Sequence, residues 1–121
     1  MGRVQDKIIL LTGGAMGLGK AAAKRLSEEG ARVLITDHNA EAGAATAAEL
    51  GSNVDFLEQD VTSPDRWGEV IAHVEAEYGR LDVLINNAAV TVFGSIADVS
   101  YEDFRRCYTV DVDSIFLGCK A

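Results

Sequence analysis

Short apolar runs alternate with longer amphipathic stretches along the chain. Four runs predict strands, at residues 7–11, 31–36, 54–58 and 81–85. Their nearly unbroken apolar character is typical of parallel strands that are buried on both faces. The stretches between and after them predict helices, at residues 16–29, 39–50, 64–78 and 100–121. This alternation predicts an α/β fold in which helices cover both faces of a parallel sheet.

Local signals support the predicted helix boundaries. Ser63 and Ser100 stand at N-cap positions, where a side-chain oxygen can accept a backbone hydrogen bond. Gly30, Gly51 and Gly79 follow three of the helices, as is common where a helix ends in a left-handed residue. No linker, repeat or low-complexity segment divides the chain, so we expect one domain.

A glycine-rich turn joins the first strand to the first helix, and it reads Thr12-Gly13-Gly14-Ala15-Met16-Gly17-Leu18-Gly19. Glycines let the backbone turn sharply and approach a phosphate without a Cβ in the way. The helix N-terminus that follows favours an anion. Asp37 ends the second strand, where a carboxylate can accept hydrogen bonds from ribose hydroxyls. Together these features predict a dinucleotide-binding unit.

Two other interpretations of the glycines stay open. Residues 14–20 nearly match a P-loop, but Ala21 follows where a P-loop needs Ser or Thr to bind magnesium. A glycine turn can also pack a helix against a sheet and bind no ligand. The position of Asp37 favours the dinucleotide interpretation over both.

Polar residues collect where the predicted strands end. A doubly wound sheet of these strands would have the order 3-2-1-4, and ligands bind at the carboxyl ends beside the reversal between strands 1 and 4. The polar residues at those ends are Thr12, Asp37, Asp60, Asn86 and Asn87. Their coincidence at one edge predicts a ligand site there.

Composition argues against several classes of partner. The formal net charge is −8, from 11 basic and 19 acidic residues. Nucleic acids and anionic membranes attract a basic face, so neither is an expected partner. No apolar run approaches the roughly 20 residues of a membrane span, and the N-terminus lacks a signal sequence. We therefore expect a cytoplasmic protein, and the isolated cysteines and histidines predict no metal site.

The Thr-Gly-x-x-x-Gly-x-Gly turn resembles the short-chain dehydrogenase/reductase family. Asn86-Asn87-Ala88-Ala89 is similar to the family's Asn-Asn-Ala-Gly signature, with Ala89 in place of Gly. The resemblance covers essentially the whole chain but only the N-terminal half of a family member. It implies a Rossmann-type doubly wound sheet that is truncated before the fifth strand. Residues 1–121 would then form one dinucleotide-binding domain.

The resemblance also implies which residues hold the cofactor. Asp60 would form a hydrogen bond near the adenine, Val61 would pack beside the ring, and Asn87 and Ala88 would lie against ribose. The full expected set is Gly13, Met16, Gly17, Leu18, Gly19, Asp37, His38, Asp60, Val61, Asn87, Ala88, Ala89 and Val110.

The expected cofactor is NAD rather than NADP. The carboxylate of Asp37 would repel the 2′-phosphate of NADP. NADP-binding proteins usually supply a cation nearby, whereas the neighbours here are Met16, Thr36 and His38. None of these is reliably cationic at neutral pH.

The last predicted helix departs from the family at one position. Its predicted buried face comprises Phe104, Tyr108, Ile115, Phe116 and Cys119. Asp111 falls close to that face, where a carboxylate must be paired, protonated or functional. The family has an Asn here that joins a proton relay through a bound water. Asp111 as an anion could not donate a hydrogen bond, so a relay role and a structural role both stay open.

The resemblance implies an NAD(H)-dependent oxidoreductase that interconverts a secondary alcohol and a ketone. Residues 114–120 look most like members that act on hydroxysteroids and other secondary alcohols, including cyclic ones. The family's Tyr-x-x-x-Lys pair and Ser lie beyond its fifth strand, and no Tyr here has Lys four positions later. A catalytically incomplete NAD-binding fragment is therefore the alternative. Family members are commonly oligomers, so we expect a homo-oligomer with a small alcohol or ketone substrate.

Overall fold

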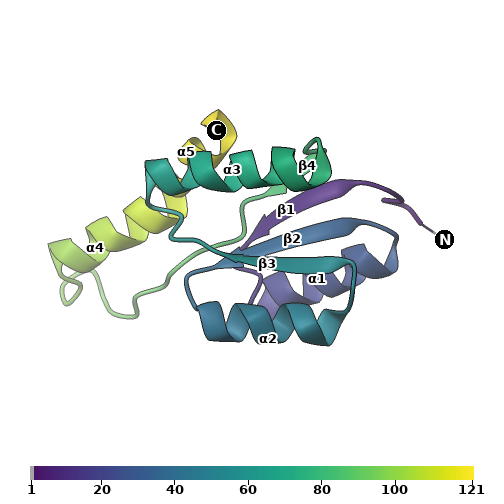
Figure 1. Ribbon diagram of the computed structural model, residues 1–121. Coiled ribbons are helices and arrows are strands. Elements are labelled where there is room, and N and C mark those ends of the chain that lie inside the picture. The colour runs from purple at the N-terminus through teal and green to yellow at the C-terminus, as the bar shows by residue number, and fades with distance from the viewer. Residues whose placement is uncertain (1) are drawn as a thin grey trace.

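The computed structural model describes residues 2–121, which form a parallel sheet with helices on both faces (Figure 1). The strands are β1 (Ile8–Thr12), β2 (Arg32–Asp37), β3 (Val54–Glu58) and β4 (Val83–Ile85). They lie in the order β3-β2-β1-β4, and every neighbouring pair is parallel. This confirms the predicted strand order, with its reversal between β1 and β4.

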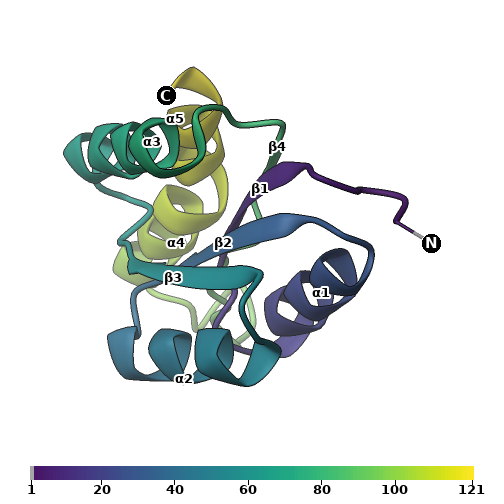
Figure 2. The same cartoon turned by 45° about the vertical axis from the view of Figure 1, so that its right-hand side comes forward.

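The helices divide between the two faces of the sheet. They are α1 (Gly17–Glu28), α2 (Ala40–Leu50), α3 (Pro64–Tyr78), α4 (Tyr101–Tyr108) and α5 (Ser114–Lys120). In Figure 2, α1 and α2 lie below the sheet, while α3, α4 and α5 lie above it. The chain therefore has three layers, as expected when apolar strands are buried on both sides.

Two apolar clusters hold these layers together, one on each face of the sheet. The cluster under α1 and α2 comprises Ile9, Leu11, Ala23, Ala31, Val33, Ile35 and Val54. The cluster under α3 comprises Leu10, Leu34, Val61, Trp67, Val70 and Val74. Successive residues of β1 and β2 enter opposite clusters because side chains alternate across a strand.

The last helical segment begins as predicted but follows a different course. Ser100 Oγ accepts a hydrogen bond from the backbone N of Asp103 at 3.1 Å, which caps α4. After α4 the backbone widens into a π-helical turn, η1 (Thr109–Asp113), before α5 begins. Such a turn spaces its hydrogen bonds one residue further apart than an α-helix does, so it changes which side chains face the sheet.

The predicted buried face of this segment is wrong. These residues are exposed: Phe104, Tyr108, Ile115, Phe116 and Cys119. Ser114 and Gly118 are buried instead. A Cβ on Gly118 would lie 2.8 Å from the ring of Trp67, so the missing side chain lets α5 pack closely on α3. Small residues make this contact, and an apolar periodicity could not identify them.

Thr12 ties the end of β1 to the segment that follows β4. Its Oγ1 accepts hydrogen bonds from the backbone N of Asn87 and of Ala88, both at 3.0 Å. Asn87 Nδ2 in turn donates to the carbonyl O of Gly13 at 3.1 Å. Thr12 is buried, so these bonds satisfy polar groups at the point where the strand order reverses.

We expect Gly118→Ala to destabilise the chain by about 1–3 kcal/mol, because the new methyl group overpacks against the buried Trp67 ring. Gly68 provides a matched control, since it is an exposed helical glycine, and a Cβ added to it would meet no atom within 4 Å. Gly68→Ala should stabilise the chain by up to about 1 kcal/mol through helix propensity. Urea unfolding measures both, and equal effects would contradict the packing argument.

Thr12→Val should destabilise the chain by about 1–3 kcal/mol, because two backbone N–H groups lose their acceptor. Thr12→Ser keeps the hydroxyl and should cost clearly less. Equilibrium unfolding of both variants tests the assignment. If Thr12→Ser proves costlier than Thr12→Val, the methyl group of Thr12 contributes more to stability than its hydroxyl, which would contradict the assignment.

Candidate functional site

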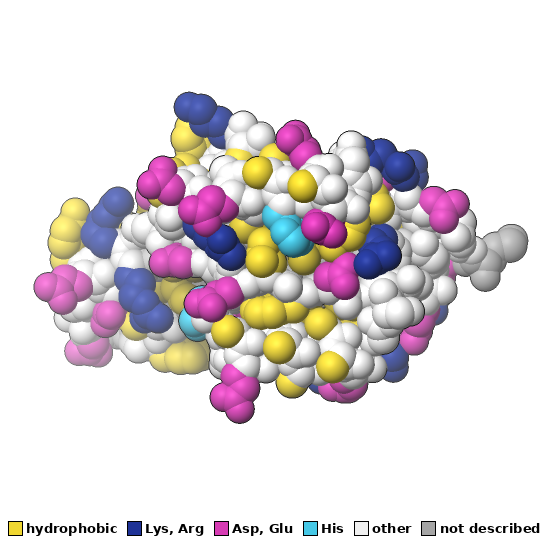
Figure 3. Space-filling model, in the orientation of Figure 1, with side chains coloured by type: hydrophobic (Ala, Val, Ile, Leu, Met, Phe, Trp, Pro, Cys, Tyr) yellow, Lys and Arg dark blue, Asp and Glu magenta, His cyan; other side chains and the backbone are white. Residues whose placement is uncertain are grey.

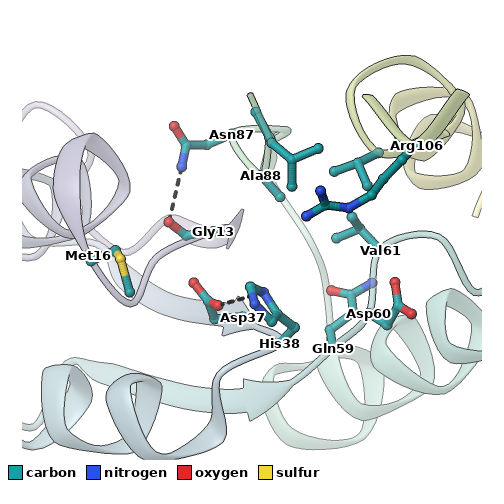
Figure 4. A pocket seen from close by; sticks show the side chains of 13 residues that line it. Gly13, Met16, Asp37, His38, Gln59, Asp60, Val61, Asn87, Ala88 and Arg106 are labelled. Carbon is teal, nitrogen blue, oxygen red and sulfur yellow. Dashed lines mark hydrogen bonds and ion pairs between the residues drawn. The ribbon is translucent and has the colours of Figure 1, made fainter. Parts of the chain in front are cut away.

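A cavity of about 470 Å³ opens at the carboxyl ends of the strands. Its wall combines segments after all four strands with the last helical segment (Figure 4). The lining residues are Gly13, Met16, Asp37, His38, Gln59, Asp60, Val61, Asn87, Ala88, Ala89, Val90, Arg106 and Val110. The cavity thus lies where open α/β sheets bind their ligands, beside the reversal of strand order.

Glycines shape the side of the site next to α1. Gly13 and Gly17 have φ angles of +67° and +59°, a region that side chains disfavour. A Cβ on Gly19 would collide with the carbonyl O of Gly13, so only glycine lets α1 begin so close to β1. Apart from its chain neighbours and its own helix, no heavy atom of residues 2–121 lies within 4 Å of a Cβ position on Gly17, and the N-cap residue Met16 makes no side-chain capping hydrogen bond. The free N–H groups of its first turn can therefore bind an anion.

Asp37 lies at the mouth of this turn. Its Oδ2 accepts a hydrogen bond from the backbone N of Ala15 at 3.2 Å, and its Oδ1 accepts one from Asn39 N at 3.1 Å. His38 Nδ1 lies 3.2 Å from Oδ1 (Figure 4). A carboxylate has roughly four acceptor positions, so Asp37 retains capacity for another donor such as a hydroxyl. Ala15 and Asp37, which are 22 positions apart in the sequence, are thus joined by a hydrogen bond, and Asp37 lines the cavity.

Asp60 and Val61 form the side of the cavity away from Gly13 (Figure 4). Asp60 Oδ1 accepts hydrogen bonds from Thr62 Oγ1 at 2.7 Å and from Thr62 N at 2.9 Å. These bonds hold the pKa of Asp60 below its usual value, so the side chain is an anion at neutral pH. The carbonyl O of Val61 accepts from Trp67 Nε1 at 2.8 Å, which fixes this segment to α3.

The structure gives Asp111 a partner. Its Oδ1 accepts a hydrogen bond from the backbone N of Val90 at 2.8 Å. This bond joins the π-helical turn to the segment after β4 and supports a structural role. Asp111 is not among the residues that line the cavity, and the relay role implied by the resemblance stays a prediction.

The cavity differs in part from the predicted set. Gly17, Leu18 and Gly19 lie outside its lining, and Leu18 is 85% exposed. Three lining residues were not predicted, namely Gln59, Val90 and Arg106. The position of Gln59, one residue before Asp60 at a strand end, could have suggested it. Arg106 comes from α4, and no sequence motif marks it.

The surface charge, the possible metal ligands and the cysteines do not indicate a second site. Figure 3 shows acidic side chains spread over one face of the molecule, with the basic side chains lying singly among them. Within residues 2–121, no three His, Cys, Asp or Glu side chains are placed to hold a metal ion. In that same range, no helix has both the length and the apolar character needed to cross a bilayer. Cys107 and Cys119 are free thiols.

Comparisons with known proteins give a consistent result. A family model described as short chain dehydrogenase matches residues 7–121. Cyclopentanol dehydrogenase of Comamonas sp. (strain NCIMB 9872) is 41% identical over 124 residues, which cover 100% of this chain and 50% of that relative. The 3-beta-hydroxysteroid dehydrogenase of Comamonas testosteroni is 42% identical over 118 residues, which cover 98% and 46%.

A solved structure is also similar. It is described as a short-chain dehydrogenase/reductase, glucose/ribitol dehydrogenase, from Brucella melitensis. It matches with a TM-score of 0.91 and 29% identity, over 96% of this chain and 50% of that chain. The chain thus spans about half the length of the relatives that it matches. Because the family model covers nearly all of the sequence and the sheet has the expected order, the chain belongs to the short-chain dehydrogenase/reductase family.

Proposed function

We propose that residues 1–121 are the dinucleotide-binding part of an NAD(H)-dependent oxidoreductase that interconverts a secondary alcohol and a ketone. One observation carries this proposal: the Asp37 carboxylate accepts a hydrogen bond from Ala15 N, inside the glycine turn. A ribose acceptor and a phosphate-binding backbone are thereby brought side by side, and a dinucleotide needs both at this separation.

The residues around the cavity suit this cofactor. The uncapped first turn of α1 would hold the phosphates, and Asp37 would hold a ribose. Asp60 offers an acceptor on the side of the cavity away from Gly13, where Val61 is apolar. The nicotinamide, when bound, accepts or delivers a hydride, which is chemistry that protein side chains do not supply. The role of this chain is to bind and orient it.

The names of two relatives support a cyclic or hydroxysteroid-like alcohol as substrate. One is a cyclopentanol dehydrogenase and the other a 3-beta-hydroxysteroid dehydrogenase, and both names refer to alcohols on rings. We further propose a cytoplasmic homo-oligomer. The exposed apolar side chains of Phe104, Tyr108 and Phe116 on α4 and α5 are consistent with a contact surface there.

A module that binds NAD without turnover is the second candidate. No Tyr in these 121 residues has Lys four positions later. Tyr78 cannot replace the missing acid/base, since its hydroxyl donates to Asp55 Oδ2 at 2.6 Å. Burial, together with the bond to Asp55, raises the pKa of Tyr78 above its ordinary value, so the phenol stays protonated at neutral pH. Asp55 lies near the start of β3, at the opposite end of the sheet from the cavity.

We expect this chain to bind NADH about tenfold or more tightly than NADPH, since a carboxylate beside the ribose repels a 2′-phosphate. Titration followed by NADH and NADPH fluorescence measures the ratio. Asp37→Asn removes the charge and should narrow the difference, because the 2′-phosphate of NADPH is no longer repelled and NADH loses a charged acceptor. Tighter binding of NADPH by the unaltered chain would contradict the assignment of NAD.

An assay for alcohol oxidation tests whether residues 1–121 are sufficient for turnover. With NAD and cyclopentanol or a 3β-hydroxysteroid, we expect NADH binding but no measurable turnover by residues 1–121. The reason is that no Tyr in these residues has Lys four positions later, so the acid/base pair that the family resemblance implies is not among them. Robust turnover would show that these residues contain an acid/base that the Tyr-x-x-x-Lys pattern does not describe.

A further inference from the structure

Thr46 is a buried polar residue that no sequence motif marks. It lies in the middle of α2 and is only 4% exposed. A Thr inside a helix often directs its hydroxyl at a carbonyl in the preceding turn of the same helix. Thr46 Oγ1 instead donates to the carbonyl O of Ala15 at 2.6 Å, 31 positions earlier in the sequence. A hydroxyl has one proton to donate, so the donor of Thr46 serves the glycine turn.

The packing of α2 brings this hydroxyl to the turn. Gly43 and Thr46 are the buried residues of α2, and their spacing of three places them on one face of the helix. A Cβ on Gly43 would collide with the ring of Phe56, so the missing side chain lets α2 approach β3 closely. On the other side, Lys20 Nζ in the first turn of α1 donates to Glu49 Oε2 at 2.7 Å. Thus α2 contacts both the glycine turn and the start of α1, which lies beside it (Figure 2).

The glycine turn is held from two elements. From β2, the carbonyl O of Thr36 accepts from Gly14 N at 3.0 Å, and Asp37 Oδ2 accepts from Ala15 N at 3.2 Å. From α2, Thr46 donates to the carbonyl of Ala15. The two bonds from β2 act on N–H groups, whereas the bond from Thr46 acts on a carbonyl. Thr46 therefore controls a peptide group that β2 leaves free.

The direction of that carbonyl decides what the turn presents to an anion. The peptide group between Ala15 and Met16 is trans, so its C=O and N–H point in opposite directions. Because the carbonyl is directed at α2, the N–H of Met16 points away from α2. Met16 lines the cavity, and Figure 4 shows it beside the turn. Within residues 2–121, the N–H groups of Met16, Gly17 and Leu18 have no acceptor, and such consecutive donors bind anions.

We propose that Thr46 is a positioning residue for the nucleotide site, because its hydroxyl fixes the peptide between Ala15 and Met16 so that the turn presents N–H groups to the phosphates. Reversal of this peptide would direct a carbonyl oxygen at them instead, which repels an anion. This inference rests on the proposed function, since it assumes that a dinucleotide occupies the cavity. It makes α2, which contributes no lining residue, a determinant of nucleotide affinity.

The first test compares NADH binding by two variants of Thr46, followed by NADH fluorescence. Thr46→Val keeps the shape of the side chain but removes the hydroxyl. It should bind NADH about tenfold more weakly than the unaltered chain, a loss on the scale of one hydrogen bond. Thr46→Ser keeps the donor and should restore binding to within about twofold. Equal affinity of Thr46→Val and the unaltered chain would contradict the role of Thr46, as would a failure of Thr46→Ser to restore binding.

Val74→Ala is the matched control for lost stability. Val74 is fully buried in the cluster under α3, on the face of the sheet opposite α2, and it does not line the cavity. Both Val74→Ala and Thr46→Val should melt at lower temperature, but Val74→Ala should bind NADH like the unaltered chain. A purely structural role for Thr46 predicts that both variants bind NADH normally below their melting temperatures. A Thr46→Val chain that does not fold would likewise overturn the inference.

Backbone NMR tests the peptide group itself. When NADH saturates the unaltered chain, the amide proton of Met16 should shift, because its N–H then donates to a charged phosphate oxygen. In Thr46→Val at saturating NADH this shift should be clearly smaller. Equal shifts in the two chains, or no shift of Met16 although NADH binds, would contradict only the role of Thr46. An unaltered chain that fails to bind NADH would contradict the proposed function itself.

Discussion

The Thr12 hydroxyl is the contact on which the geometry of the site depends. Where the strand order reverses, the chain leaves β1 toward one face of the sheet and leaves β4 toward the other face. The backbone groups of these two loops therefore have no hydrogen-bond partners within the sheet. Thr12 Oγ1 accepts from two consecutive N–H groups there, those of Asn87 and Ala88. Gly13 can then approach so closely that a Cβ on it would lie 2.9 Å from the Cα of Ala88. Two loops that are distant in sequence thereby become one wall.

Much of the fold could be predicted because its signals are local. The span of β3 and the end of α3 at Tyr78 agree with the predictions, since strand and helix ends carry their own turn residues. The strand order follows from the alternation of strands and helices together with general rules for parallel sheets. β4 begins at Val83, two residues later than predicted, because apolar content alone does not fix where pairing starts.

The sequence predicted those parts of the site in which a residue type at a given position has one common role. Asp37 after a glycine turn is such a case, and the structure brings the two together. The position of Arg106 at the cavity and the hydrogen bond from Val90 N to Asp111 are different cases. Both depend on how α4 and η1 pack against the sheet. The exposed aromatic face of α4 shows the same limit. Periodicity reveals that a helix has an apolar side, but it does not reveal which neighbour, if any, covers that side.

The π-helical turn at Thr109–Asp113 makes the end of the chain sensitive to its residue count. Each residue of an α-helix advances the next by about 100° around the axis. Deleting one residue from this turn would leave a regular helix but rotate everything after it by about that angle. Gly118 would then swing away from the Trp67 ring and a bulkier neighbour would replace it. The interval between Val110 and Gly118 should therefore tolerate exchanges of side chains far better than changes in length.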